Sequence, residues 1–113
     1  MCDRYSKEYR NCIQMSGGVT SNMIDCINNE TSNIDHKIKK ISSSLLVKIP
    51  EENSKALANA MKSWRQFLDY GNTAMYDLNM GTIENLTAAE WYLAEHAKML
   101  AWLEGIAKKY EVY

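Results

Sequence analysis

Three cysteines and two histidines are the side chains whose spacing could indicate a zinc site or a disulfide. Cysteines in a short chain serve as free thiols, metal ligands or disulfide partners. Cys2, Cys12 and Cys26 are ten and fourteen residues apart, with no Cys-x-x-Cys, and His36 and His96 are sixty residues apart. This spacing disfavours a zinc site and favours a disulfide between Cys12 and Cys26.

The loop closed by such a disulfide would span about 15 residues, which a chain-entropy argument values at roughly 3 kcal/mol. Because disulfides persist in oxidising compartments, the pairing predicts a periplasmic or secreted protein. The first residues, Met1 to Tyr5, lack the apolar core of a signal peptide, so we expect one to have been removed. The sequence leaves three roles open for Cys2: a lipid anchor, an intermolecular disulfide or a free thiol without a role.

Catalytic chemistry is not predicted. The sequence contains no Gly-x-Ser-x-Gly, His-Glu-x-x-His or glycine-rich phosphate loop. Glu95 and His96 are adjacent, so on a helix their side chains would point about 100° apart. We expect no enzyme, no metal and no other cofactor, with both histidines on the surface or on a helix face.

One long stretch carries charge of a single sign. From Gln66 to Ala97 there is no Lys or Arg, but there are five acidic residues together with tyrosines, methionines and a tryptophan. Such stretches are most often only solvated, yet these residue types are enriched in binding hot spots. The candidate partner-binding residues are Asp69, Tyr70, Tyr76, Asp77, Glu84, Glu90 and Trp91. The net charge of −1 argues against nucleic-acid binding.

Long helices would have to position these residues. From Thr20 to Ile49 apolar residues recur at spacings of three, four or seven, the pattern of one helix face. Thr20 or Ser21 is the expected N-cap, and Pro50 ends the helix. Six residues form the buried face: Ile24, Ile27, Ile34, Ile38, Ile41 and Leu45.

Two further helices are predicted after Pro50. The first begins at Pro50-Glu51-Glu52 and includes Trp64 and Phe67 as core aromatics. Gly71 would end this helix, loosen it or only weaken it. The second begins near Thr82, with Thr87 as the other candidate cap, and runs to about Lys109. Its buried face comprises Leu86, Ala89, Leu93, Ala97, Leu100 and Leu103.

The predicted fold is a single all-α domain over residues 1–113. It is an elongated antiparallel helical hairpin or three-helix bundle, and residues 2–16 form a short N-terminal helix or arm tied on by the disulfide. No run of eighteen apolar residues occurs, so no membrane span is expected.

Several motifs together resemble a known family. Cys12 and Cys26 are followed by Ile34-Asp35-x-x-Ile38, Leu57-x6-Trp64-x-x-Phe67 and Gly81-Thr82. This order resembles the LprI family of bacterial lysozyme inhibitors and their uncharacterised relatives, over about residues 11–103. The resemblance implies a small exported helical protein with a disulfide. Lys39, Met61 and Asn72 depart from the residues that the family often has at these positions.

The leading interpretation is an exported binding protein that inhibits lysozyme or a related cell-wall hydrolase by covering its cleft. Lysozymes are commonly basic, so an acidic, aromatic end of a helical hairpin would be attracted to one. One alternative is an immunity protein against a secreted peptidoglycan-degrading effector. Another is a structural component of the cell envelope.

Overall fold

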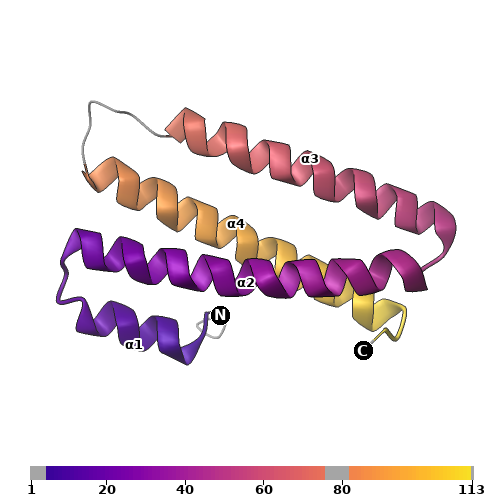
Figure 1. Cartoon of the computed structure of the whole chain (residues 1–113), viewed down its shortest axis with the longest axis horizontal. Coiled ribbons are helices and arrows are strands. Elements are labelled where there is room, and N and C mark those ends of the chain that lie inside the picture. Colours follow the sequence, from indigo (N-terminus) through magenta and orange to yellow (C-terminus); the bar gives the residue numbers. More distant parts are fainter. Residues whose placement is uncertain (1–4, 76–81, 113) are drawn as a thin grey trace.

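The computed structural model describes residues 5–75 and 82–112, and for residues 82–84 it describes the backbone only. Four helices make up this part of the chain: α1 (Lys7–Met15), α2 (Thr20–Lys48), α3 (Glu51–Met75) and α4 (Thr82–Lys109). They form an elongated bundle of 47 × 30 × 19 Å (Figure 1). The all-α prediction is confirmed, as is a long last helix from Thr82 to Lys109.

A turn that contains two glycines connects α1, the arm, to α2. Gly17 and Gly18 have φ angles of 62° and 78°, a left-handed conformation that other residues adopt only with strain. The turn leads directly into α2, so its N-cap is Val19, without a side-chain cap. The expectation that Thr20 or Ser21 caps this helix was therefore wrong.

Two contacts pin α1 to α2. The predicted disulfide between Cys12 and Cys26 is present, with its Cα atoms 5.7 Å apart. Near the other end of α1, Glu30 accepts hydrogen bonds from the backbone N–H of Ser6 at 2.6 Å and from its hydroxyl at 2.8 Å. The Ser6 Oγ in turn accepts from the N–H of Tyr9, which caps α1. The arm is thus held near both of its ends.

Pro50 separates α2 from α3, as predicted. Ile49 has extended backbone angles, and α3 starts at Glu51, with Glu51 and Glu52 in its positive first turn. The connection is short, since only Ile49 and Pro50 separate the two helices. Ser54 bridges it, because its hydroxyl donates to the carbonyl of Leu46 at 2.6 Å. The two helices are therefore antiparallel neighbours.

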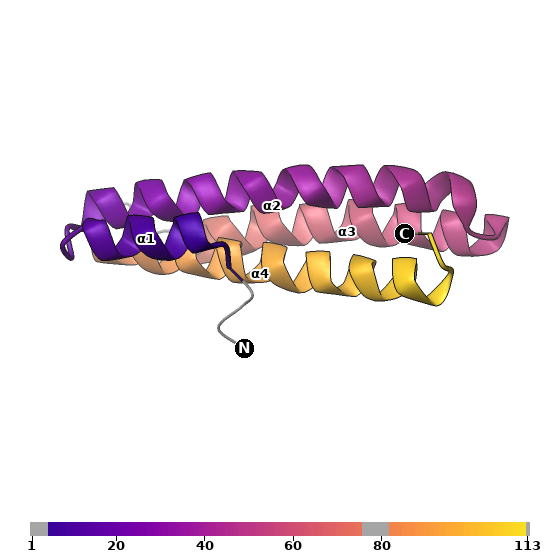
Figure 2. The same cartoon turned by 90° about the horizontal axis from the view of Figure 1, so that it is seen from below.

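The core lies mainly between α2 and α4, which touch each other far more extensively than either touches α3 (Figure 2). The α2 and α4 faces both follow the predicted stripes, whereas α3 buries only Leu57 and Leu68 completely. Eight residues form the α2–α4 seam: Ile27, Ile34, Ile38 and Leu45 from α2, and Leu93, Ala97, Leu103 and Ala107 from α4.

The prediction that Phe67 is a core aromatic was wrong, because 52% of its surface is exposed. Its ring packs edge to face on that of Trp91, at a centroid distance of 5.6 Å and an angle of 65°. The physical reason is the limited contact of α3 with the other helices, which leaves part of its apolar stripe uncovered. Trp64, by contrast, packs against the core while remaining partly accessible.

One end of the bundle gathers segments that are far apart in the sequence. The α1–α2 turn, the last residues of α3 and the first residues of α4 all lie at the same end (Figure 1). We call it the disulfide end, because Cys12 and Cys26 are also part of it. Within the described residues, no helix is both long and apolar enough to cross a membrane.

The disulfide should contribute measurably to stability. Replacing Cys12 and Cys26 together by serine frees a loop with a sequence separation of 14 residues. The free energy of unfolding should fall by about 3 kcal/mol, measured by urea denaturation under oxidising conditions. Cys2→Ser is the matched control, because Cys2 does not belong to this disulfide. An equal loss in both variants would contradict this role.

Candidate interaction surface

The predicted binding residues that the structure describes lie near the disulfide end, on α3 and α4. Asp69 and Tyr70 are exposed close to the end of α3, and Tyr70 exposes 78% of its surface. Glu90 is exposed on α4, and its neighbour Trp91 is half-buried. Tyr76 and Asp77 lie outside the described residues, as does the side chain of Glu84.

Asp69 lines a polar hollow of about 510 Å³ between α2, α3 and α4, here called the asparagine hollow. The carboxylate of Asp69 and burial together raise the pKa of Tyr92, burial being the larger cause. The Oδ1 atom of Asn85 is buried and has no hydrogen-bond partner among the described residues. Nine residues line this hollow: Ile24, Asn28, Asp69, Asn72, Thr73, Asn85, Ala88, Ala89 and Tyr92.

Glu90 and Trp91 line a different hollow, of about 460 Å³, on another side of α4. We call it the arm hollow, because Tyr9 of α1 and Tyr5, which precedes α1, form one wall. Of the predicted residues that the structure describes, Asp69 therefore lines one hollow and Glu90 and Trp91 line another, while Tyr70 belongs to the lining of neither. The lining of the arm hollow comprises Tyr5, Tyr9, Met75, Thr87, Glu90, Trp91, Leu93 and Ala94.

Trp91 also joins α3 to α4. Its six-membered ring lies so close to Gly71 that a Cβ at this position would overlap the Cη2 atom of Trp91 and come within 2.9 Å of Cζ2. α3 runs through Gly71 to Met75. The predicted alternative in which Gly71 ends this helix is therefore wrong. The glycine lets the indole approach the α3 backbone closely.

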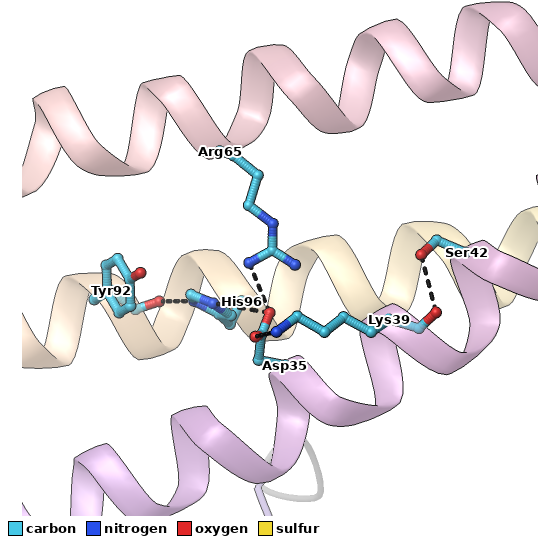
Figure 3. Close-up of polar contacts among 6 residues, drawn as sticks. All are labelled: Asp35, Lys39, Ser42, Arg65, Tyr92 and His96. Carbon is cyan, nitrogen blue, oxygen red and sulfur yellow. Dashed lines mark hydrogen bonds and ion pairs between the residues drawn. The ribbon is translucent and has the colours of Figure 1, made fainter.

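A polar cluster ties the three long helices together in the middle of the bundle (Figure 3). Asp35 of α2 lies 2.7 Å from Arg65 of α3, through Oδ1 and Nη1, and 3.3 Å from Lys39, through Oδ2 and Nζ. The contact with Arg65 is a close ion pair rather than a well-aligned hydrogen bond. Burial raises the pKa of Asp35, but Arg65 and then Lys39 outweigh it and leave the pKa below its ordinary value.

His96 completes the cluster from α4. We expected both histidines on the surface or a helix face; His36 is exposed, but His96 exposes only 1%, so a surface position was wrong for it. Its Nδ1 lies 2.8 Å from the carbonyl oxygen of Tyr92. A carbonyl only accepts, so Nδ1 carries the proton and Nε2 faces Oδ1 of Asp35 at 3.6 Å.

Burial sets the protonation of His96. It lowers the pKa below the ordinary value, aided by the charge of Arg65, while the Tyr92 carbonyl and Asp35 act in the opposite direction with less effect. The ring also packs on Trp64, at a centroid distance of 5.0 Å, and on Tyr92, at 4.6 Å. The imidazole is therefore a neutral, packed part of the core at neutral pH.

The side chains of this cluster serve packing between helices. The carboxylate of Asp35 is already paired with two cations, and His96 is enclosed by aromatic rings. In the part of the chain that the structure describes, no three Cys, His, Asp or Glu side chains gather in a way that could hold a metal ion. Because Arg65 reaches across to Asp35, the cluster fixes α3 against the other helices.

Sequence reasoning missed His96, Glu30 and the arm tyrosines as members of these sites. A signal for His96 was available: Leu93, His96, Leu100 and Leu103 follow spacings of three, four and three, which places His96 on the apolar stripe. No comparable signal exists for Tyr5 and Tyr9, because their contacts with α4 depend on how the arm folds back.

Comparison with known proteins gives one match. The model of the family described as "Lysozyme inhibitor LprI" matches residues 12–103. This range begins at the first cysteine of the disulfide and includes Asp35, Arg65 and His96. No curated protein and no solved structure matches the chain.

The two helical glycines predict opposite effects of alanine. In a helix interior alanine is favoured over glycine by about 1 kcal/mol. Nothing lies within 4 Å of a Cβ at Gly105, so Gly105→Ala should raise the free energy of unfolding by up to about 1 kcal/mol. Gly71→Ala must displace the ring of Trp91, so it should lower this free energy by about 1–3 kcal/mol.

Urea denaturation measures both glycine variants, and tryptophan fluorescence adds a second readout. A changed emission spectrum is expected for Gly71→Ala and not for Gly105→Ala, since only Gly71 contacts an indole. Equal stabilisation by both substitutions would show that the contact between Gly71 and Trp91 is not rigid.

The polar cluster predicts a loss of stability on acidification. The unfolded chain protonates His96 around its ordinary pKa of 6.5, whereas the folded chain does so only at lower pH. The free energy of unfolding should therefore fall as the pH decreases through 6.5. Asp35, with its lowered pKa, adds stability above its ordinary value of 3.8 that is lost below it.

Urea denaturation between about pH 7.5 and pH 4.5 isolates the contribution of His96. His96→Gln should flatten the pH dependence in this range, whatever its effect on absolute stability. His36→Gln should keep the dependence, because His36 is exposed. An unchanged slope in His96→Gln would assign the dependence to other groups.

Proposed function

Because the chain belongs to the LprI family of lysozyme inhibitors, we propose that it is an exported protein that inhibits lysozyme or a related cell-wall hydrolase. The observation that carries the proposal is the family match over residues 12–103, which covers most of the 113 residues. The disulfide supports export, because such bonds persist in oxidising compartments. Inhibition requires binding only and no catalytic residue of this chain.

We propose that the disulfide end binds the hydrolase, through the residues predicted from the sequence. Two properties support this placement. The stretch from Gln66 to Ala97 has five acidic residues and no cation, which suits a basic partner. Its exposed aromatic residues, Phe67 and Tyr70, offer apolar contact area of the kind that binding hot spots use.

The mode of inhibition follows from shape. The bundle is long and narrow, and its helices have a shared core, so its end is a firm projection. A projection of this kind can cover the cleft of a lysozyme without being cleaved, because a lysozyme hydrolyses glycosidic bonds and the bundle is a polypeptide. The proposal is therefore steric occlusion of the cleft by the disulfide end.

The test is inhibition of a basic c-type lysozyme, measured as clearing of a bacterial cell suspension. The wild-type protein should inhibit at a micromolar concentration, and inhibition should weaken with added salt. Asp69→Lys combined with Glu84→Lys should weaken it at least about tenfold through like-charge repulsion.

The matched control reverses two charges away from this end, with Glu52→Lys and Glu104→Lys. It has the same net charge as the first variant and should inhibit like the wild type. Absence of inhibition by the wild type, tested also on g-type and bacterial muramidases, would reject the lysozyme version of the proposal. Equal weakening by both double variants would reject the disulfide end as the site.

A further inference from the structure

The arm hollow is lined by aromatic side chains of the N-terminal segment and of α4. Tyr5 and Tyr9 come from the arm segment and Trp91 from α4, while Met75 of α3 closes another side. At about 460 Å³ the hollow is large enough for one long side chain or a small ligand. It lies at the end of the bundle that we assign to partner binding.

The rings are arranged as walls. Tyr5 and Tyr9 meet edge to face, with centroids 5.1 Å apart and planes inclined by 64°. Trp91 lines the hollow from α4, and its edge-to-face partner, Phe67, is not part of the lining. A sugar ring binds best by stacking on one open aromatic face, whereas rings inclined to each other can surround a compact cation. The geometry therefore favours a cation.

The charge of the lining points the same way. Glu90 lies at the hollow, and no ion pair of its carboxylate is found among the described residues. The pKa of Tyr9 is raised, first by burial and then by Tyr5, Glu90 and Glu30. The carboxylates of Glu90 and Glu30 therefore make the electrostatic potential at its hydroxyl more negative. Among the residues that the structure describes, no Lys or Arg lines the hollow.

We propose that the arm hollow binds the side chain of an arginine or lysine from a basic partner protein, with Glu90 pairing its charge and Tyr5, Tyr9 and Trp91 surrounding it. This rests on the proposed function, because the partner is then the hydrolase. A guanidinium or ammonium group gains cation–π attraction from such rings in addition to the ion pair. The hollow becomes an anchor point within a broader acidic surface.

The disulfide acquires a role in binding from this assignment. Cys12 is three residues from Tyr9, and the bonds from Ser6 to Glu30 lie next to Tyr5. Both pins therefore hold a ring of the hollow in place. Opening the disulfide should weaken binding of the cation and not only the stability of the fold.

Two readouts test the proposal, one of which does not involve a hydrolase. In the first, arginine amide is titrated into the labelled protein while NMR follows the indole N–H signals of the three tryptophans. The signal of Trp91 should move with saturation. That of Trp102, exposed near the other end, should not, which makes it an internal control.

Substitutions at the hollow supply the second comparison, in the titration and in lysozyme inhibition. Glu90→Gln and Tyr9→Leu should each weaken binding by about fivefold to tenfold, whereas Tyr9→Phe retains the ring and most of the binding. The Cys12→Ser, Cys26→Ser double variant should weaken the titration with arginine amide similarly. Glu104→Gln removes an exposed carboxylate outside the arm hollow and should behave as the wild type.

The results separate the hollow from the function. If the wild type does not inhibit any hydrolase but arginine amide moves Trp91, the proposed function fails and the cation site stands. If the wild type inhibits while Glu90→Gln and Glu104→Gln are indistinguishable in both readouts, the cation site is rejected. A shift of Trp91 with chitin oligosaccharides and none with arginine amide would also reject it, in favour of a glycan site.

Discussion

The apolar seam between α2 and α4 is the constraint on which the rest of the structure depends. Ile38, Leu45 and Leu103 lie in it without any exposed surface. Since α2 and α4 run in the same direction, the chain must return along the bundle between them, and α3 is that return (Figure 1). α3 mainly connects the end of α2 to the start of α4 and covers little of the core. Its position against the other helices therefore depends on a few local contacts. Arg65 with Asp35, and Gly71 with Trp91, provide two of them.

The same constraint explains which parts of the fold could be predicted. The stripes of α2 and α4 repeat every three or four residues because each faces the other along its length, so periodicity alone identified their buried faces. Pro50 ended α2 for a steric reason that does not depend on the rest of the protein. The stripe of α3 has the same periodicity, yet Phe67 is half-exposed. Periodicity states which face of a helix is apolar, and the neighbouring helices decide how much of it is covered.

The polar contacts were harder to predict because each joins residues distant in the sequence. Glu30 is 24 residues from Ser6, and nothing in its local sequence distinguishes a buried carboxylate that holds the arm from a solvated one. His96 could have been placed in the core from its spacing, but its partner Asp35 could not, since that pairing depends on the register of α2 against α4. For the candidate site, composition identified the acidic stretch, whereas its division between two hollows follows from the faces of α4.

The position of the disulfide bears on the proposed binding end of the bundle. From the sequence, the loop between Cys12 and Cys26 stabilises the start of the chain, and the acidic stretch from Gln66 to Ala97 lies far away. In the folded chain the disulfide lies at the same end as the last residues of α3 and the first residues of α4, because α2 and α4 begin side by side there (Figure 1). The disulfide restrains α1, and α1 supplies a wall of the arm hollow next to Glu90 and Trp91. A covalent restraint on an otherwise short helix limits the conformational entropy that binding would have to overcome. The disulfide that stabilises the fold is then also the restraint that would prepare the proposed binding surface for a partner.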